Sequence, residues 1–217
     1  MIDSNPDGPF RYPVSDIEDQ DQAPAGITPS QTVGPYVHIG LLREGTEDLL
    51  ADAGPSGSGD SIDVSFAIYD GEGEPITDAM VEIWQPDDAG IFNSPLDPRT
   101  GTNATADGFR GLGRAMADDS GTATFRTIRP GVPELDGVDA EAPHLKVGVF
   151  ARGMLERLYT RMYFPENDGA NAADPVLGLV GEERRALLVG KRTDGGYHLD
   201  IRMQDDDPTR ETPFFAL

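Results

Sequence analysis

The segment APHLKVGVFA (residues 142–151) has the pattern of a buried β-strand with a histidine near its start. Apolar side chains recur at every second position, at Leu145, Val147 and Val149. His144 and Lys146 should therefore project together from the opposite face, roughly 6–7 Å apart. Two histidines at this spacing could share one metal ion, but an ammonium group has no lone pair to donate. The segment therefore raises the question of whether a metal site lies here.

Similar patterns recur on both sides of this segment. In SIDVSFAIYD (61–70), apolar residues alternate with mostly polar ones, which is typical of a half-buried strand, and GEGEP (71–75) predicts a turn. Further strands are predicted at residues 79–85, 121–131, 156–164 and 197–203, and a short helix at 182–189. Several short strands separated by turns predict an all-β fold, either a sandwich or a barrel.

The remaining stretches predict loops and extended chain. Residues 28–42 mix turn formers with an apolar end and predict an extended segment, whereas residues 44–60 predict a surface loop with at most one helical turn. Residues 86–113 predict a long irregular connection. Residues 1–26, rich in Asp, Pro, Gly and Gln, predict an acidic, partly flexible arm, which leaves residues 27–217 as a single domain.

The composition excludes several classes of partner. The chain carries 39 acidic residues against 17 Lys and Arg, with a net charge of −22 and a pI near 4.2. Such a surface is unsuited to nucleic acid and to anionic membranes. Lys146 and Lys191 are the only lysines. An acidic, lysine-poor surface indicates either a salt-adapted host or biased codon usage, and the sequence leaves both open.

The absence of cysteine limits the chemistry and suggests a compartment. Without thiols the chain can form no disulfide, zinc–thiolate site or thiol nucleophile. No run of about 18 apolar residues is present to form a membrane-spanning helix. The start MIDSNPDGPF lacks the basic and apolar regions of a secretory signal. We therefore expect a cytoplasmic protein.

Six segments, taken in order, carry a family resemblance. They are TPSQTVGPYVHIG (28–40), VEIWQPDDAGIF (81–92), FRTIRPG (125–131), APHLKVGVFARG (142–153), YTRMYF (159–164) and LDIRM (199–203). Each is a modest signal, but together they resemble the intradiol ring-cleavage dioxygenases over about seven-eighths of the chain. Within that family, the resemblance is to the non-catalytic chains of members built from two homologous chains.

The resemblance implies a β-sandwich core of mixed topology, with long loops and one or two short helices. It also implies a homologous partner chain that binds a non-haem ferric ion through two tyrosines and two histidines. Phenolate and imidazole ligands suit this hard metal ion. A catechol-type aromatic substrate chelates the iron of such enzymes and reacts with dioxygen between its two hydroxyl carbons.

The ligand positions of the family can be followed onto this sequence one at a time. The first tyrosine position, eight residues after Trp84, is Phe92. The second falls in the run after FRTIRPG, where Val132 and Pro133 are the nearest candidates. The His-x-His pair corresponds to His144 and Lys146. Only His144 keeps a ligand group, so the resemblance implies that this chain binds no metal and that the Fe(III) belongs to its partner.

The segment around Gly34 has a different implied role. In the family it reaches the rim of the partner's active site, so the resemblance implies that Thr32, Gly34, Pro35 and Tyr36 form part of the wall of the substrate pocket. Glycine followed by proline gives a fixed bend with few side-chain atoms, which lets the backbone approach a flat ligand. The alternative is that the pair simply joins two extended pieces.

The other polar and aromatic residues have simpler interpretations. His144 is interpreted as a structural hydrogen-bond donor within a vestigial pocket, His38 as a core or interface residue, and His198 as exposed. Trp84 is interpreted as a core anchor. Tyr159 and Tyr163 fit a packed aromatic strand face better than a pair of phenolate ligands. The arginines of this region are interpreted as solvated; they are Arg152, Arg157 and Arg161.

Three functions remain to be weighed. The first is a non-catalytic subunit that binds a homologous iron-bearing chain, shapes its substrate pocket and builds a larger symmetric hetero-oligomer. The second is a stand-alone β-sandwich binding module without an enzyme partner. The third is a self-sufficient dioxygenase with unfamiliar ligands, for which the sequence offers only scattered donors.

Overall fold

The structure is a computed structural model. The ranges that it describes are residues 32, 34, 36–52, 59, 61–99, 108–133 and 140–215. Contacts between residues divide the chain into Met1–Gln31 and Thr32–Leu217, and every described residue belongs to the second unit. The predicted arm at 1–26 lies outside the described residues, so its boundary with the domain stays a prediction.

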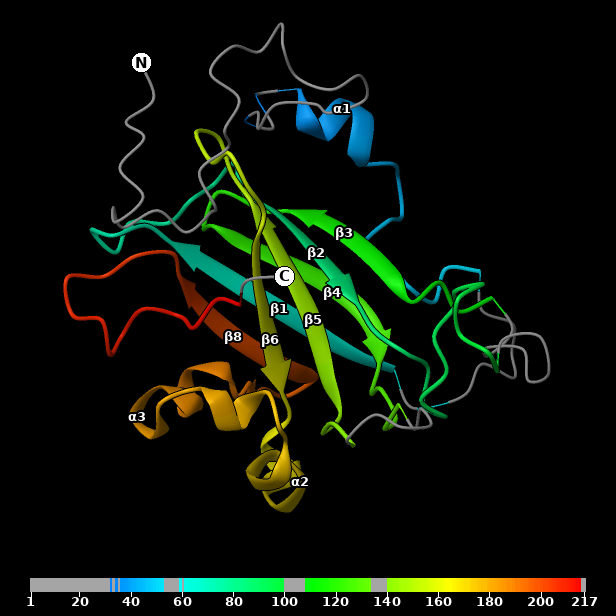
Figure 1. The fold of residues 1–217 in the computed structure, drawn as a ribbon. Helices are drawn as coiled ribbons and strands as arrows, with labels where there is room; N and C mark the ends of the chain where they lie inside the picture. Colours follow the sequence, from blue (N-terminus) through cyan, green and yellow to red (C-terminus); the bar gives the residue numbers. More distant parts are fainter. Residues whose placement is uncertain are drawn as a thin grey trace, which may run out of the picture. The chain divides into compact units, whose positions relative to one another are not determined.

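Two four-stranded sheets form the centre of the described structure (Figure 1). The first sheet has the order β4 (Thr122–Ile128), β1 (Ser61–Tyr69), β8 (Gly196–Arg202) and β7 (Lys191–Arg192). The second has the order β3 (Leu112–Met116), β2 (Met80–Trp84), β5 (His144–Phe150) and β6 (Leu158–Tyr163). β1 and β8 run parallel, whereas the other neighbouring strands of these two sheets pair antiparallel. The predicted all-β sandwich of mixed topology is confirmed.

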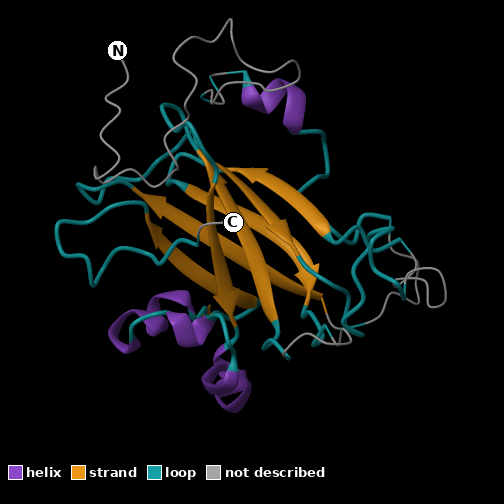
Figure 2. Ribbon diagram, viewed as in Figure 1, coloured by secondary structure: helices purple, strands orange, loops and turns teal. Residues whose placement is uncertain are grey.

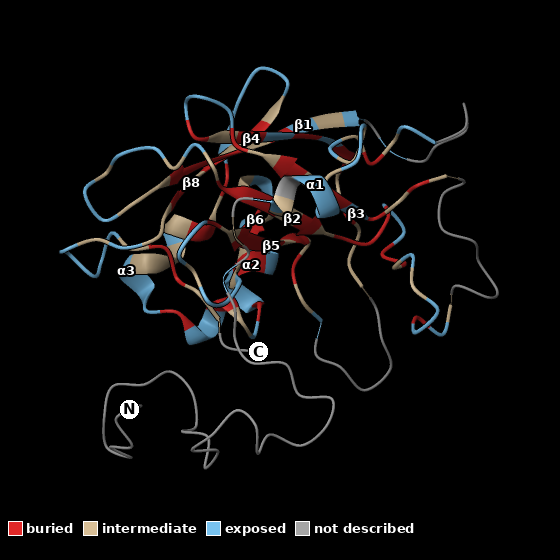
Figure 3. Ribbon diagram, turned by 90° about the horizontal axis from the view of Figure 1, so that it is seen from above, coloured by how far each residue is buried: buried red, intermediate tan, exposed pale blue. Residues whose placement is uncertain are grey.

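The hydrophobic core lies between the two sheets. β1 contributes Val64, Phe66 and Ile68, and β5 contributes Leu145, Val147 and Val149; all six are fully buried. Buried positions are concentrated along the strands (Figure 3). Because these residues alternate along each strand, the same alternation leaves His144 and Lys146 on the outer face of the second sheet.

Short helices lie at the periphery of the sheets (Figure 2). The α-helices are α1 (Val37–Leu41), α2 (Asp168–Ala173) and α3 (Glu182–Arg185). Single 3₁₀ turns cover Pro165–Asn167, Leu177–Leu179 and Ala186–Leu188. The segment containing α2 and α3 packs a small cluster of apolar residues, including Leu177 and Leu188, against Tyr163 at the end of β6. None of the helices in the described ranges is long and apolar enough to cross a lipid bilayer.

Three sequence predictions about local structure are wrong. Residues 37–41 are helical rather than extended. Leu49 is fully buried, and its amide donates a hydrogen bond to the carbonyl oxygen of Arg126 in β4, so residues 44–60 are not simply a surface loop. Residues 112–116 form β3, which the sequence did not predict. Gly113 faces the core there, where an added Cβ would lie 2.5 Å from Leu49 Cδ1.

Candidate functional site

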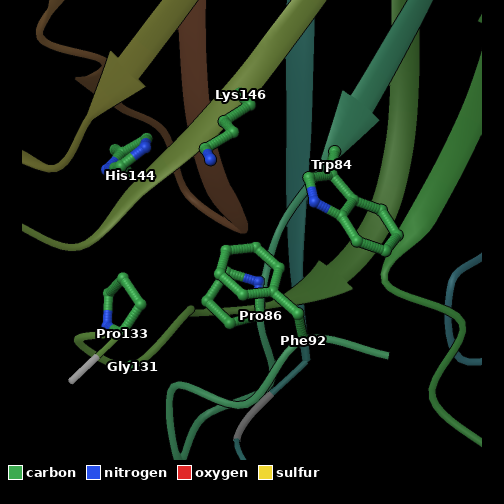
Figure 4. A pocket seen from close by; sticks show the side chains of 7 residues that line it. All are labelled: Trp84, Pro86, Phe92, Gly131, Pro133, His144 and Lys146. Atoms are coloured by element: carbon green, nitrogen blue, oxygen red, sulfur yellow. The ribbon is translucent and has the colours of Figure 1, made fainter. Parts of the chain in front are cut away.

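A small pocket opens on the outer face of the second sheet, at the end of β2 and the start of β5. The space between the residues that line it is too small to hold a water molecule. Seven residues line it: Trp84, Pro86, Phe92, Gly131, Pro133, His144 and Lys146 (Figure 4). The structure therefore brings together the four positions at which the sequence suggested vestigial ligands, although they come from three separate stretches of the chain.

Strand pairing fixes where the two β5 side chains lie. His144 pairs with Tyr163 of β6, and Lys146 pairs with Arg161 of β6 on one side and with Trp84 of β2 on the other. Paired residues in a sheet point to the same face, so these side chains surround the same region. The pocket is thus built on a rigid element, with its mouth formed by the loops that follow β2 and β4.

His144 is buried and serves as a hydrogen-bond donor. Its side chain is 3% exposed, and Nδ1 lies 2.8 Å from the carbonyl oxygen of Ala142. A carbonyl can only accept, so Nδ1 carries the hydrogen. Burial, with the Arg161 charge as the second cause, lowers the pKa of His144 to about 4. The imidazole is therefore neutral at pH 7, which agrees with the structural role predicted from the sequence.

Lys146 points into the pocket between aromatic walls (Figure 4). Its Nζ lies 5.2 Å from the centre of the Phe92 ring, a cation–π contact. The Phe92 ring in turn stacks on Trp84, with ring centres 5.7 Å apart and planes inclined by 16°. Burial lowers the pKa of the Lys146 ammonium from its usual value. Trp84, predicted as a core anchor, is instead a half-buried wall of this pocket.

A network of polar groups holds the far side of β5. Arg161 lies 3.1 Å from the Glu141 carboxylate. The Tyr163 hydroxyl donates to Asp174 at 3.0 Å, and the same buried carboxylate accepts from the amide of Ala142 at 2.8 Å. Burial raises the pKa of the Tyr163 phenol, so it stays protonated. The packed role predicted for Tyr163 is confirmed, whereas Arg161, predicted to be solvated, is paired and mostly buried.

The residues at the four ligand positions do not fit a ferric ion. Phe92 and Pro133 offer no donor side chain, and the Lys146 ammonium would repel a cation. His144 supplies one imidazole. Within the described residues, no group of three or more His, Cys, Asp or Glu side chains could hold a metal ion. An iron site with two phenolates and two imidazoles cannot be assembled from these side chains.

Of the proposed pocket-wall segment, the described residues Thr32, Gly34 and Tyr36 do not line this pocket. The Thr32 hydroxyl accepts a hydrogen bond from the amide of Gly153 at 3.1 Å. Gly34 has φ +69°, a backbone conformation that favours glycine, and Tyr36 is 74% exposed. Pro35 lies outside the described residues. The role of this segment at a substrate stays a prediction.

The two remaining histidines differ from each other. His38 lies in α1. His198 was predicted to be exposed, but only 27% of its side chain is, and its two ring nitrogens lie 2.8 Å from Ser65 Oγ and 3.1 Å from Asp200 Oδ1. β8 lies beside β1, which brings Ser65 opposite His198. This pairing is a structural contact on the other sheet, away from the pocket.

Some residues around the pocket gave no usable sequence signal. Glu141 and Asp174 reach β5 and β6 from connecting segments, and Asp174 comes from the helical stretch after β6. Gly131 has no room for a side chain, because an added Cβ would lie 2.3 Å from Asp88 O. Gly131 is the glycine of the Ile-x-Pro-Gly run, which in the sequence served only to locate the second ligand position.

Comparisons with known proteins agree with this architecture. A family model described as "Dioxygenase" matches residues 34–204. The dioxygenase domain of a carbohydrate-binding fusion protein from Streptomyces sp. SirexAA-E superimposes with a TM-score of 0.52 at 23% identity, covering 82% of this chain and 98% of that domain. At this level of identity, the likeness supports the fold alone.

Curated relatives are closer in sequence. Protocatechuate 3,4-dioxygenase alpha chains from Pseudomonas putida and Burkholderia cepacia are 37% and 39% identical, covering 87% and 88% of this chain and 95% and 97% of the relatives. The beta chain of the Burkholderia cepacia enzyme is 30% identical over 85% of this chain and 79% of the relative. The chain therefore belongs to the intradiol ring-cleavage dioxygenase family, and it is more similar to these two alpha chains than to this beta chain.

Proposed function

We propose that the chain is the non-catalytic alpha subunit of a protocatechuate 3,4-dioxygenase. In this proposal a homologous beta chain would hold the Fe(III), and the metal would supply the chemistry that makes a catechol ring reactive toward dioxygen. The enzyme cleaves protocatechuate between its two hydroxyl carbons to give 3-carboxy-cis,cis-muconate. The present chain binds no cofactor of its own; it completes the substrate pocket of its partner and builds a higher-order symmetric hetero-oligomer.

The observation that carries the proposal is the composition of the pocket beside β5. Four positions that suit a metal site by their place in the family pattern converge on one small space, yet they offer one imidazole, one ammonium and no phenolate. A catalytic iron therefore has to come from another chain. The similarity to both alpha and beta chains supports a partner of the same fold.

Exposed apolar side chains support a large interface with that partner. In the short stretch from Tyr36 to Leu41, Tyr36 is 74%, Ile39 is 68% and Leu41 is 40% exposed. A group of large apolar side chains on the surface is typical of an interaction site. We place the adjacent residues Thr32, Gly34 and Pro35, together with Tyr36, at the edge of the substrate pocket of the partner.

Two further parts of the proposal concern the whole chain. Residues 1–26 form an acidic arm, and residues 27–217 form the single dioxygenase-like domain. We expect the complex to be cytoplasmic, since aromatic ring cleavage of this kind needs neither a membrane nor disulfides. A stand-alone binding module is the second candidate, and the exposed side chains between Tyr36 and Leu41 would then contact a different macromolecule.

Co-expression with a beta chain tests the proposal. The partner should be a homologous chain that carries both tyrosines and the His-x-His pair, ideally encoded beside this one. Co-purification as a stoichiometric complex, with iron in the complex and none in the isolated chain, is the expected result. Oxygen uptake with protocatechuate should require both chains. A chain that stays monomeric and does not bind the beta chain would favour the stand-alone binding module.

A further inference from the structure

Among the described residues, Lys146 is a partly buried basic side chain with no carboxylate within 4.0 Å. Most basic side chains in the described ranges lie within 4.0 Å of a carboxylate, and Arg184 and Arg185 donate to backbone carbonyls. Among them Lys146 and the exposed Arg43 have neither contact. The chain has 39 acidic residues for 17 basic ones, so carboxylates are not scarce.

The position of Lys146 makes the lack of a partner costly. Its side chain is partly buried, and burial is the main cause that lowers the pKa of its ammonium. A partly buried charge is expected to have a partner, because water no longer solvates it fully. The negative charge of Glu141 acts on Lys146 and raises the pKa of its ammonium, but this carboxylate pairs with Arg161 at 3.1 Å. The Phe92 ring satisfies one side of the ammonium only.

The surroundings of the ammonium suit an anionic group that arrives on a tether, because the narrow pocket itself has no room for a free ligand. Its walls are the rings of Trp84 and Phe92, with Pro133 and the neutral His144 opposite (Figure 4). The three N–H groups of an ammonium form their strongest hydrogen bonds to an ionised acceptor. A single lysine on a chain of net charge −22 would hold a free anion poorly, because the surrounding field repels it. A carboxylate that belongs to a larger interface can still bind, because the other contacts of the interface hold it close to the ammonium.

We propose that Lys146 anchors an Asp or Glu side chain of the partner chain, which reaches the ammonium at the protein surface, beside the Phe92 ring, when the two chains associate. The inference rests on the proposed function, since it requires a partner of the same family. The inference assigns a role to this site. The Lys146 ammonium lies at a position where the family has a metal ligand, and the ammonium binds a carboxylate of the other chain instead of a metal ion.

The test compares the two lysines of the chain. Lys146→Met removes the charge and keeps an apolar stem that can rest on Phe92, whereas Lys191→Met removes a lysine that already pairs with Asp200. Both variants are mixed with the beta chain, and the dissociation constant and the two rate constants are measured. Lys146→Met should weaken the complex tenfold or more, mainly through faster dissociation, and Lys191→Met should leave it unchanged.

Two further measurements separate an interface anchor from a packing residue. The isolated Lys146→Met chain should melt no lower than its parent, because the unpaired charge has been removed. Lys146→Arg should restore most of the affinity. An unchanged dissociation constant for Lys146→Met would overturn the inference, as would weakened binding accompanied by a lower Tm. Saturable binding of acetate to the isolated parent chain, lost in Lys146→Met, would also overturn it in favour of a small-molecule site.

The two proposals fail in different ways. If the parent chain does not associate with the beta chain at all, the proposed function is wrong, and the inference falls with it. If the parent associates and supports ring cleavage while Lys146→Met does so equally well and equally tightly, the function stands and the inference alone is wrong.

Discussion

The ring of Phe92 lies nearly parallel to that of Trp84, with ring centres 5.7 Å apart. The Lys146 ammonium lies against the same Phe92 ring, at 5.2 Å from its centre. These contacts give Phe92 a packing role at the position where the family resemblance places a tyrosine ligand. The pocket is therefore a packed structure in its own right, and the space between its walls is too small to hold a water molecule.

The first prediction is that restoring two ligands does not restore a metal site. In the double variant Phe92→Tyr with Lys146→His, Pro133 still provides no donor, and the tyrosine ring remains held by Trp84. Metal analysis of the isolated variant should find no stoichiometric iron, and oxygen uptake with protocatechuate should stay at background. Iron bound one to one, together with ring cleavage in the absence of a beta chain, would contradict our account of the pocket.

The second prediction concerns pH and His144. Burial lowers its pKa from 6.5 to about 4, so between these values the unfolded chain binds a proton that the folded chain excludes. Stability should therefore fall as pH decreases from 6.5 to 4, by roughly 3 kcal/mol from this group. This contribution is absent in His144→Phe. The unfolding free energy of the parent minus that of the variant should therefore decrease as the pH is lowered from 6.5 to 4.

The readout for His144 is that difference, measured by denaturant unfolding at each pH. Using a difference matters because Glu141, Arg161 and Lys146 all lie near the imidazole and remain in both proteins. A constant difference from pH 7 to pH 4 would mean that the imidazole takes up its proton in the folded chain as easily as in the unfolded one.

The third prediction is that Asp174 is a principal support of the segment preceding β5. Its buried carboxylate accepts hydrogen bonds from Tyr163 and from the backbone amides of Ala142, Val176 and Leu177. Asp174→Ala leaves several buried donors without an acceptor, which should cost about 3 kcal/mol or more of unfolding free energy. The exposed Asp206 provides the control, since Asp206→Ala should change stability little. Equal melting temperatures for the two variants would refute this role.

The elements that the sequence predicted share a simple physical basis. Val64 and Phe66 of β1 are buried, whereas Ser65 between them faces the other side of the sheet. When one face of a strand is buried, apolar residues recur at every second position, and this alternation predicts the strand. β3 was not predicted, because its sequence lacks this alternation of apolar residues. Gly113 faces the core there because Leu49 leaves no room for a side chain, and a glycine at a core position breaks the expected pattern.

The family pattern identified residues that line the pocket, but not the contacts that these residues make with their neighbours. Phe92 and Lys146 could be placed by their order in the family pattern, yet the contact between them depends on how the loop after β2 folds over the sheet. The pairing of Arg161 with Glu141 depends on strand register, which sets Arg161 opposite Lys146. Local sequence patterns carry no information on either relationship, so Arg161 looked like a solvated residue.

The last prediction concerns Gly34 and the wall of the substrate pocket. Gly34 has φ +69°, a conformation that a β-branched residue adopts only with strain, and no atom lies within 4 Å of the position of an added Cβ. In the complex with the beta chain, we expect backbone at Gly34 to lie close to the aromatic substrate. Gly34→Val should therefore raise the apparent KM tenfold or more, equivalent to about 1.4 kcal/mol of lost binding.

Gly45→Val separates this local effect from backbone strain in general. Gly45 has φ +76° and equally open space around its Cα, but it lies in the turn before Leu49 and outside the proposed wall. Both variants should lose some stability, because valine is strained at either position. Only Gly34→Val should raise KM when the kinetics are normalised to iron content. The iron content itself should be unchanged, because in the proposed function the iron ligands belong to the other chain. If Gly34→Val assembles normally and its KM matches that of Gly45→Val and the parent, the segment is a structural turn, and the contribution of this chain is limited to assembly.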